Sequence, residues 1–291
     1  MCEIVVLEVG MGGELDATNV ISAPEAAVFT NIGLDHMQYL GGTVEAIAAT
    51  KSKIIKPGCS AVSYEQQPSV RAVLRERCTE TGVDFTEADF SKLRLCSSGL
   101  DGQIFDYGEE TGIRIALLGE HQRRNAAVVL ETVGVLRRKG WILPEDAVRR
   151  GMEQAHWPAR FEILSREPLF ILDGGHNPQC MEALTACLKE TLGGRGVIFL
   201  AGVMADKDWE NMFAPIEPLA SEYIAVESDN PRRLPAEELA AFLSRGGKPA
   251  AAVPDVRQAV ALALQKAGAD GVVCAAGSLF MAGDIRSCFE K

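Results

Sequence analysis

The stretch LFILDGGHNPQCMEALTACLKETLGGRGVIFL, residues 169–200, contains two apolar runs with an amphipathic segment between them. The run at 169–172 has the length of a buried strand and ends at Asp173. Asn177 and Pro178 are typical of a helix N-cap and a first helical position, so the sequence predicts a helix over 178–192. The second apolar run, 197–200, predicts another buried strand. A strand, a helix and a strand in this order form the repeating unit of a parallel sheet.

The same alternation continues toward the C-terminus. Beyond residue 200 the sequence predicts, in order, a helix at 209–216, a strand at 223–226, helices at 236–243 and 256–266, and a strand at 271–275. Alternating strands and helices predict a doubly wound parallel sheet. The Trp157-Pro158 break before them marks a domain boundary, so we expect an α/β protein whose second domain covers 157–291.

The first 156 residues are expected to form another, less regular domain. Strands are predicted at 4–9, 27–30, 61–64, 93–96, 103–107 and 114–118, the last three antiparallel, and helices at 43–56, 69–81, 122–139 and 144–155. Pro57-Gly58 and Gly140 are the expected stop signals of the first and the third of these helices.

Composition excludes several classes of protein. The formal net charge of -11, without a long Lys/Arg run, argues against a protein that binds nucleic acid or an anionic membrane. No run approaches the length of a membrane span, and no signal-peptide pattern begins the chain. The eight cysteines include no CxxC pair and are interpreted as reduced thiols. We therefore expect a cytoplasmic protein that is a monomer and binds small molecules.

EVGMGGELDATN, residues 8–19, follows an apolar run and combines a lone carboxylate with three glycines. Gly10, Gly12 and Gly13 permit a tight turn and a close approach to a ligand, and Glu8 is placed like a metal-binding carboxylate. The alternative is a tight turn beside a partly exposed acid. The segment is not a dinucleotide fingerprint, because Leu15 stands where GxGxxG needs its last glycine.

A second predicted strand end places Asp35 and His36 in a loop before the helix at 43–56. A lone Asp-His pair is also compatible with a structural role. Lys51 lies on the apolar face of that helix, whereas Lys53 and Lys56 have solvated positions. A desolvated lysine has a lowered pKa and a usable neutral amine, so Lys51 is a candidate for modification or catalysis; the alternative is that it snorkels to water.

In the second domain, Asp173 and His176 precede a helix N-terminus, where backbone N–H groups favour anions. They are candidates for a nucleotide site, and the alternative is a capped helix with an incidental histidine. Arg160, at the domain junction, either reaches a phosphate across the cleft or pairs with a surface acid such as Glu162.

Seven segments, in order along the chain, resemble the signature segments of the folylpolyglutamate synthase/dihydrofolate synthase family, a branch of the Mur ligases. They are EVGMGGELDATN, TNIGLDHMQYLGGTVEAIAATKSKIIKPG, GEHQRRNAA, PARFEIL, ILDGGHNP, GVMADKDW and AAGSLFMAGDIR. The resemblance covers nearly the whole chain and implies a central ATPase domain over 1–156 followed by a Rossmann-like ligase domain. It also implies an ATP-dependent ligase: ATP phosphorylates a folate carboxylate, and the amine of L-glutamate displaces the phosphate to form an amide.

The resemblance assigns a role to individual residues. Glu8 and His36 match Mg²⁺ ligands, Lys51 a lysine that the family carbamylates near the metal, Asp16 a pterin contact, Asn125, Arg160, Asp173 and His176 the ATP site, and Ser278 the glutamate-binding end. Lys51, Arg160 and His176 are the expected catalytic residues. The implied cofactors are ATP and Mg²⁺, with a monovalent cation as an option.

The chain also departs from the family pattern. It contains no GxxxxGK[ST] loop, whose amides and lysine would hold the phosphates of ATP, so we expect a truncated member that is inactive on its own. Glu14 stands where an arginine is common. The alternatives are another Mur-type amide ligase and a non-catalytic module that binds nucleotide or folate. If it is a ligase, the residues of the two domains should face each other across a cleft, with the Trp157-Pro158 segment as hinge.

Overall fold

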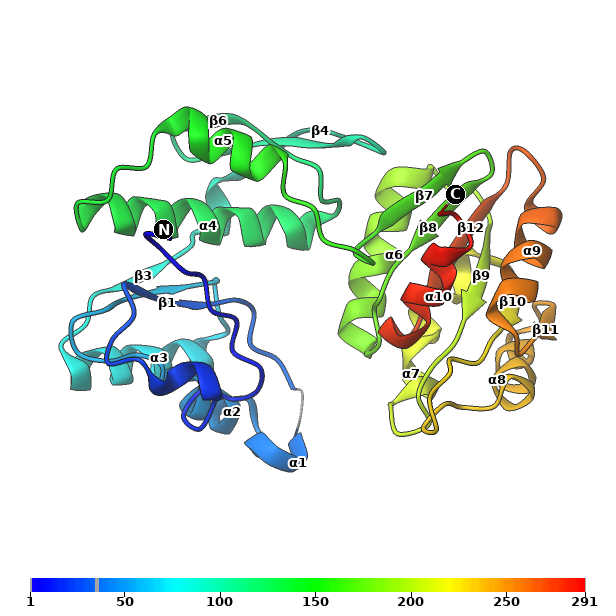
Figure 1. Ribbon diagram of the computed structural model, residues 1–291, viewed down its shortest axis with the longest axis horizontal. Coiled ribbons are helices and arrows are strands. Elements are labelled where there is room, and N and C mark those ends of the chain that lie inside the picture. Colours follow the sequence, from blue (N-terminus) through cyan, green and yellow to red (C-terminus); the bar gives the residue numbers. More distant parts are fainter. Residues whose placement is uncertain (1, 35–36, 291) are drawn as a thin grey trace. The chain divides into compact units, whose positions relative to one another are not determined.

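The computed structural model describes residues 2–34 and 37–290, which form two compact units (Figure 1). Unit 1 comprises Met1–Arg94, Phe105–Ile113 and Arg123–Met152; unit 2 comprises Leu95–Ile104, Arg114–Gln122 and Glu153–Lys291. The chain passes between the units several times before residue 153, and the domain boundary near residue 157 stays a prediction. No helix among the described residues is both long enough and apolar enough to cross a bilayer.

Unit 2 contains a six-stranded sheet in the order β11-β10-β9-β12-β8-β7. Its strands are β7 (Glu162–Arg166), β8 (Leu169–Leu172), β9 (Val197–Ala201), β10 (Ala220–Ala225), β11 (Ala250–Ala252) and β12 (Val272–Ala276). Neighbouring strands are parallel except for β7, which pairs antiparallel with β8 at the edge. The predicted parallel sheet is confirmed, whereas β7 and β11 were not predicted.

Helices cover both faces of this sheet (Figure 1). They are α6 (Pro178–Leu192), α7 (Trp209–Met212), α8 (Ala236–Leu243), α9 (Val256–Ala267) and α10 (Ala282–Ser287), with 3₁₀ turns η3 (Ala214–Leu219), η4 (Ser244–Gly246) and η5 (Leu279–Met281). Alternate strand residues point to opposite faces. Ile171 therefore packs in a core with residues of α6 and α8, and Leu172 packs in a second core with residues of α9 and α10. The predicted helix at 209–216 is divided into α7 and η3, because Pro215 lacks the N–H that a continuous helix would need.

Unit 1 contains a parallel sheet in the order β1-β2-β3. Its strands are β1 (Ala26–Phe29), β2 (Ser60–Ser63) and β3 (Phe85–Glu87), and its helices are α1 (Met37–Leu40), α2 (Val44–Ser52), α3 (Pro68–Thr81), α4 (Glu120–Arg138) and α5 (Glu145–Glu153). Helix α4 begins in unit 2 and continues in unit 1. Residues of α2 and α3 form one core with the sheet. Two 3₁₀ turns, η1 (Ala17–Val20) and η2 (Phe90–Lys92), complete the local structure.

A third sheet has the order β4-β5-β6, with β4 (Leu93–Gly99), β5 (Gly102–Tyr107) and β6 (Glu110–Ile115). These are the three strands predicted around residues 93–118. The buried strand predicted at 4–9 is wrong: these residues form no strand, and Val6 is 92% exposed. An apolar run forms a strand only where a neighbouring backbone pairs with it, and β1 pairs with β2 alone.

Candidate functional site

The turn before β7, residues 157–161, carries Arg160 between two residues with unusual backbone geometry. Ala159 and Phe161 have φ values of 54° and 46°, a region that residues with a side chain rarely occupy. Both side chains are buried, Ala159 in the core beside α9 and α10 and Phe161 in the core beside α6. In an extended strand, residues two apart would face the same side. The left-handed turn therefore buries its two neighbours on opposite faces of the sheet and leaves Arg160 between them.

Asp173, at the end of β8, holds this turn in place. Its Oδ2 accepts a hydrogen bond from the backbone N–H of Phe161 at 2.9 Å, and its Oδ1 accepts one from Gly175 at 2.8 Å. The N–H of Gly174 donates to the carbonyl oxygen of Ala159 at 2.8 Å. Burial raises the pKa of the Asp173 carboxyl, while the two N–H donors and the nearby charge of Arg160 act in the opposite direction. The carboxylate thus joins the arginine turn to the glycine turn.

The guanidinium of Arg160 forms few interactions with the residues around it. Its Nη1 donates to the Ala159 carbonyl oxygen at 3.3 Å. Within residues 2–34 and 37–290, no carboxylate lies within 4.0 Å of its guanidinium nitrogens. Glu162, the alternative partner suggested by the sequence, forms an ion pair with Arg286 at 3.4 Å instead. The pairing of Arg160 with Glu162 is therefore wrong, and the guanidinium is available to an anion.

The N-terminus of α6 lies directly after the glycine turn. Asn177 is its N-cap and accepts a hydrogen bond from the backbone N–H of Cys180 at 2.8 Å, as predicted. His176 is half-buried, and its Nδ1 lies 3.0 Å from the carbonyl oxygen of Gly174. A side chain at Gly174 would lie 3.0 Å from Arg160 Nη1 and 2.1 Å from Leu279 Cδ2. A larger residue at position 174 would therefore displace the side chains of Leu279 and Arg160.

The end of β12 brings Ser278 to the same edge of the sheet. Ser278 is 2% exposed, and its hydroxyl accepts a hydrogen bond from the N–H of Phe280 at 3.1 Å. The preceding residue, Gly277, donates its N–H to the carbonyl oxygen of Gly175 at 3.0 Å. Unit 2 thus gathers the predicted residues Arg160, Asp173, His176 and Ser278 at the carboxyl ends of β8 and β12, where ligands bind in open parallel sheets.

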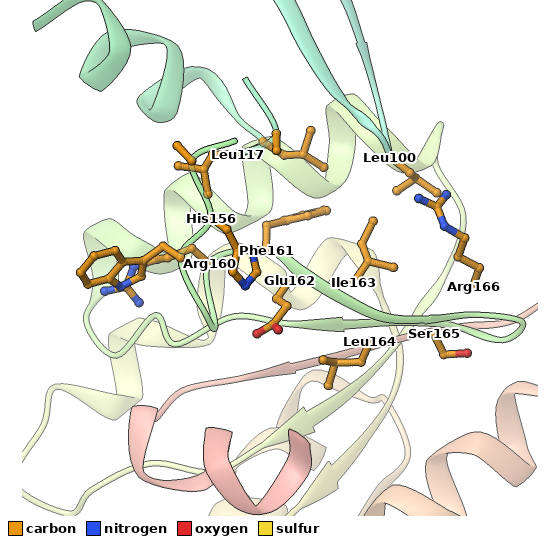
Figure 2. Close-up of a pocket in the computed structure, with 14 residues that line it drawn as sticks. Leu100, Leu117, His156, Arg160, Phe161, Glu162, Ile163, Leu164, Ser165 and Arg166 are labelled. Atoms are coloured by element: carbon orange, nitrogen blue, oxygen red, sulfur yellow. The ribbon is translucent and has the colours of Figure 1, made fainter. Parts of the chain in front are cut away.

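A cavity of about 470 Å³ adjoins the arginine turn along β7 (Figure 2). It is lined by Leu100, Ala116, Leu117, Leu118, Ala155, His156, Trp157 and residues 160–166. Figure 2 shows Arg160 and Arg166 at opposite ends of the cavity, with Phe161 and Ile163 between them. Arg166 forms an ion pair with Asp101 at 2.6 Å, so Arg160 is the less neutralised of these two cations.

In unit 1, Asp16 organises the glycine-rich turn. Its Oδ2 accepts hydrogen bonds from the N–H groups of Gly10 and Met11 at 2.9 and 3.0 Å. Its Oδ1 accepts from the N–H and the hydroxyl of Thr18 at 2.9 and 2.6 Å, and Asp16 is the N-cap of η1. Both oxygens of Asp16 therefore hold the loop, and the predicted contact of Asp16 with a pterin stays a prediction.

Two of the three glycines are explained by packing against α2. A side chain at Gly13 would lie 2.9 Å from the carbonyl oxygens of Thr50 and Lys51, and Gly12 has a φ of 70° beside Thr50. The turn therefore lies directly on the last turn of α2, next to the backbone of Lys51, whose side chain is half-buried. Lys56 was expected to be solvated; that was wrong, because its ammonium donates to the carbonyl oxygens of Asn19, at 2.8 Å, and Ile21.

The predicted metal ligands are not brought together by any described contact. Glu8 is exposed in a segment without helix or strand, and His36 lies outside the described residues. In the part of the chain that the structure describes, no group of three or more His, Cys, Asp or Glu side chains is placed to hold a metal. Asn125, predicted for the ATP site, is half-buried on α4. The metal set, Asn125 and the cleft between the two domains stay predictions.

Sequence reasoning missed the residues that hold the site residues in place. Glu162 and Lys56 contact backbone groups, and Arg286 contacts Glu162. An isolated charge in a sequence does not reveal such a contact. The left-handed conformations of Ala159 and Phe161 had no sequence signal, because glycine or asparagine usually occupies them. The Gly277-Ser278 pair directly after an apolar strand was the one available signal for the end of β12.

The hydrogen bonds of Asp16 predict an unusual titration. The hydroxyl of Thr18, then the backbone N–H groups of Met11 and Thr18, lower the pKa of the Asp16 carboxyl to about 2. Because the pKa of Asp16 in the folded chain lies below the ordinary value of 3.8, the ionised carboxylate stabilises the loop above about pH 4, and this stabilisation is lost as pH falls from about 4 through about 2. Carbon-detected NMR of the Asp16 carboxyl should give a midpoint near 2. Thr18→Val should move it upward, and a midpoint near 3.8 in the unsubstituted chain would contradict the described hydrogen bonds.

Comparisons with known proteins agree with the family resemblance and with the fold. Residues 1–133 match the Mur ligase middle domain, and residues 159–279 match the Mur ligase glutamate ligase domain. The chain is 36% identical over 241 residues to folylpolyglutamate synthase of Lacticaseibacillus casei, covering 80% of this chain and 56% of the relative. It is 31% identical over 290 residues to dihydrofolate synthase/folylpolyglutamate synthase of Bacillus subtilis, covering 98% of this chain and 67% of the relative.

A solved structure, that of Mycobacterium tuberculosis folylpolyglutamate synthase complexed with ADP and AMPPCP, aligns with a TM-score of 0.85 and 30% identity, covering 97% of this chain and 67% of the other. The chain therefore spans between about half and two thirds of the length of these relatives. The motifs, the mixed α/β fold and these likenesses together show that the chain belongs to the folylpolyglutamate synthase/dihydrofolate synthase family of Mur ligases.

Proposed function

We propose that this chain is the nucleotide- and glutamate-binding part of an ATP-dependent ligase that adds L-glutamate to folate, with or without dihydrofolate synthase activity. The observation that carries the proposal is the guanidinium of Arg160, which has no carboxylate partner among the described residues and lies on a turn fixed by Asp173. The α6 N-terminus follows the same glycine turn, and helix N-termini favour anions. Nucleotide phosphate is the ligand that this chemistry fits best.

The residues of unit 2 have separable tasks in this reaction. Arg160 would offset negative charge on the phosphoryl oxygens as an acyl phosphate forms on the folate carboxylate. His176, held at the glycine turn, would lie at the junction of the nucleotide and the incoming amine. Ser278, buried at the end of β12, would bind the glutamate substrate. The amine of L-glutamate then attacks the acyl carbon and phosphate leaves.

The residues of unit 1 would hold the folate and the metal. We propose Asp16 as a pterin contact, Asn125 as an ATP contact, and Glu8, His36 and a carbamylated Lys51 as ligands of Mg²⁺. When bound, Mg²⁺ would neutralise phosphate charge; the described donors form no metal cluster, so no step of the reaction is derived through it. A carbamate would give the half-buried Lys51 the negative charge that such a ligand needs.

We further propose that these 291 residues do not turn over by themselves. They contain no GxxxxGK[ST] loop to hold the β- and γ-phosphates, so the remaining contacts should bind nucleotide weakly, with a Kd on the order of 1 mM. The alternatives are a different Mur-type amide ligase and a non-catalytic module. The ligase would share the predicted nucleotide contacts but not the folate contact at Asp16, and the module would bind nucleotide or folate without turnover.

The experiment is a titration of the ¹⁵N-labelled chain with AMPPCP, followed by NMR. We expect saturating shift changes at the amides of Phe161, Gly174, Gly175 and His176, because these residues form the arginine turn and the adjoining glycine turn. Arg160→Ala should weaken binding about tenfold, the typical loss for one charge-assisted contact. Arg166→Ala, at the other end of the same cavity, is the matched control and should leave Kd unchanged. No saturable change at these amides would refute the proposal.

A further inference from the structure

The arginine turn is held on its second side by Glu162, the first residue of β7. Glu162 Oε2 accepts a hydrogen bond from the backbone N–H of Ala159 at 2.8 Å. Its Oε1 lies 3.4 Å from Nε of Arg286, on α10, and its side chain is only 10% exposed. A continuous path of contacts thus runs from the last helix of the chain through Glu162 to the backbone directly before Arg160.

This contact matters because the turn is strained. The left-handed region is sterically unfavourable for a residue with a side chain, and Ala159 and Phe161 both occupy it. Such a conformation persists only where its surroundings hold it. Asp173 holds the N–H of Phe161, Gly174 holds the carbonyl oxygen of Ala159, and Glu162 holds the N–H of Ala159. Without Glu162, one end of the turn would be free to relax toward an extended path.

Arg286 has a second effect on the same carboxylate. Glu162 lies two residues from Arg160 in the chain and is the nearest acid in sequence that could neutralise it. Because Arg286 is paired with Oε1 and the Ala159 N–H with Oε2, both oxygens of Glu162 are engaged elsewhere. Opposite charges within a few ångströms stabilise each other, so this arrangement keeps the negative charge of Glu162 from quenching the cation of Arg160.

We propose that Glu162 and Arg286 are positioning residues for Arg160: Glu162 fixes the turn that presents the guanidinium, and Arg286 fixes Glu162. The proposal rests on the nucleotide role of Arg160 proposed above. It assigns helix α10 a part in nucleotide binding. Helix α10 packs in the same core as Ala159, and Phe161 lies in the core on the other face of the sheet.

The test is a double-mutant cycle on AMPPCP affinity with Glu162→Ala, Arg160→Ala and the double variant. If Glu162 acts through Arg160, Glu162→Ala should raise Kd about tenfold and should have no further effect in the Arg160→Ala chain. Glu162→Gln keeps an oxygen acceptor for the Ala159 N–H and should recover most of the affinity. Arg286→Ala should raise Kd about threefold. Arg257→Ala is the control, because Arg257 contacts Ser287 at the same helix and does not reach the turn.

Additive losses in the cycle would overturn the proposal, since a general structural defect would weaken binding with or without Arg160. Amide hydrogen exchange supplies a readout that needs no ligand: Glu162→Ala should lose protection at the N–H of Ala159, and Arg257→Ala should not. If the unsubstituted chain bound no nucleotide, the proposed function would fail, and the exchange rates would still decide whether Glu162 holds the turn. Unchanged exchange at Ala159 would reject that role.

Discussion

Gly277→Ala is expected to lower the stability of unit 2 by about 3 kcal/mol or more. Gly277 has a φ of 112°, where a side chain is strained, and an added Cβ would lie 2.4 Å from the carbonyl oxygen of Gly202. The Cβ would be fixed to the backbone directly after β12, and the carbonyl oxygen belongs to the backbone directly after β9, so neither atom can rotate away. Urea denaturation, with amide exchange in these two strands, measures the loss.

Gly283→Ala is the matched control for this substitution. Gly283 lies in α10, and a Cβ there would meet no atom within 4 Å. Alanine is favoured over glycine within a helix by roughly 0.5–1 kcal/mol, so this change should leave stability unchanged or raise it. Equal losses from Gly277→Ala and Gly283→Ala would show that the close approach to Gly202 is not what requires glycine at residue 277.

Gly13→Ala should detach the glycine-rich turn from α2. The new Cβ would lie 2.9 Å from the carbonyl oxygens of both Thr50 and Lys51 and 3.1 Å from Cα of Lys51, and a helix backbone cannot yield to it. Overpacking of this kind costs about 1–3 kcal/mol. The low pKa of Asp16 should rise in this variant, because the N–H donors of the turn would move with the loop.

Gly42→Ala serves as the comparison for Gly13→Ala, because no atom lies within 4 Å of a Cβ built there. We expect it to keep both the denaturation midpoint and the Asp16 titration of the unsubstituted chain. If Gly13→Ala left the Asp16 carboxyl titrating near 2, the packing of the turn on α2 would not be what positions Asp16.

The fold of unit 2 was largely predictable, because its strands are short apolar runs and its helices carry local stop and start signals. Asn177 with Pro178 fixed the start of α6 correctly, and Gly193 ends it in a left-handed conformation. Edge strands were harder. β7 is the mixed segment EILSR, and β11 is only three alanines, which have a low strand propensity, so neither contains an apolar run like those of the inner strands. Residues 4–9 show the opposite error: the apolar run predicted a strand, but the structure has no strand there because no neighbouring strand pairs with it.

The position of a candidate side chain was predictable from the sequence, whereas the backbone contacts that hold it were not. Asp173 and His176 were candidates because they follow a predicted strand end, and Arg160 because it lies at the predicted domain junction; the structure brings all three to one edge of the sheet, and their roles stay predictions. The structure adds that both carboxylate oxygens of Asp173 accept hydrogen bonds from backbone N–H groups, which the spacing of residues along a sequence cannot show. Helix periodicity predicted an inward position for Lys51 and solvated positions for Lys53 and Lys56, yet all three are half-buried. Lys56 contacts backbone carbonyls because α2 ends at Ser52 and the chain then turns.

The burial of Ala159 and Phe161 in separate cores has a consequence for mutational tolerance. The turn anchors itself in the cores on both faces of the sheet. A larger side chain at Ala159 would therefore overpack the core beside α9 and α10, and a smaller one at Phe161 would leave a cavity beside α6. Trp157, two residues before Ala159, is 56% exposed and is packed in neither core, so its size is not restricted in this way. A saturation scan across 157–161 should therefore pass, within five residues, from free substitution to almost none.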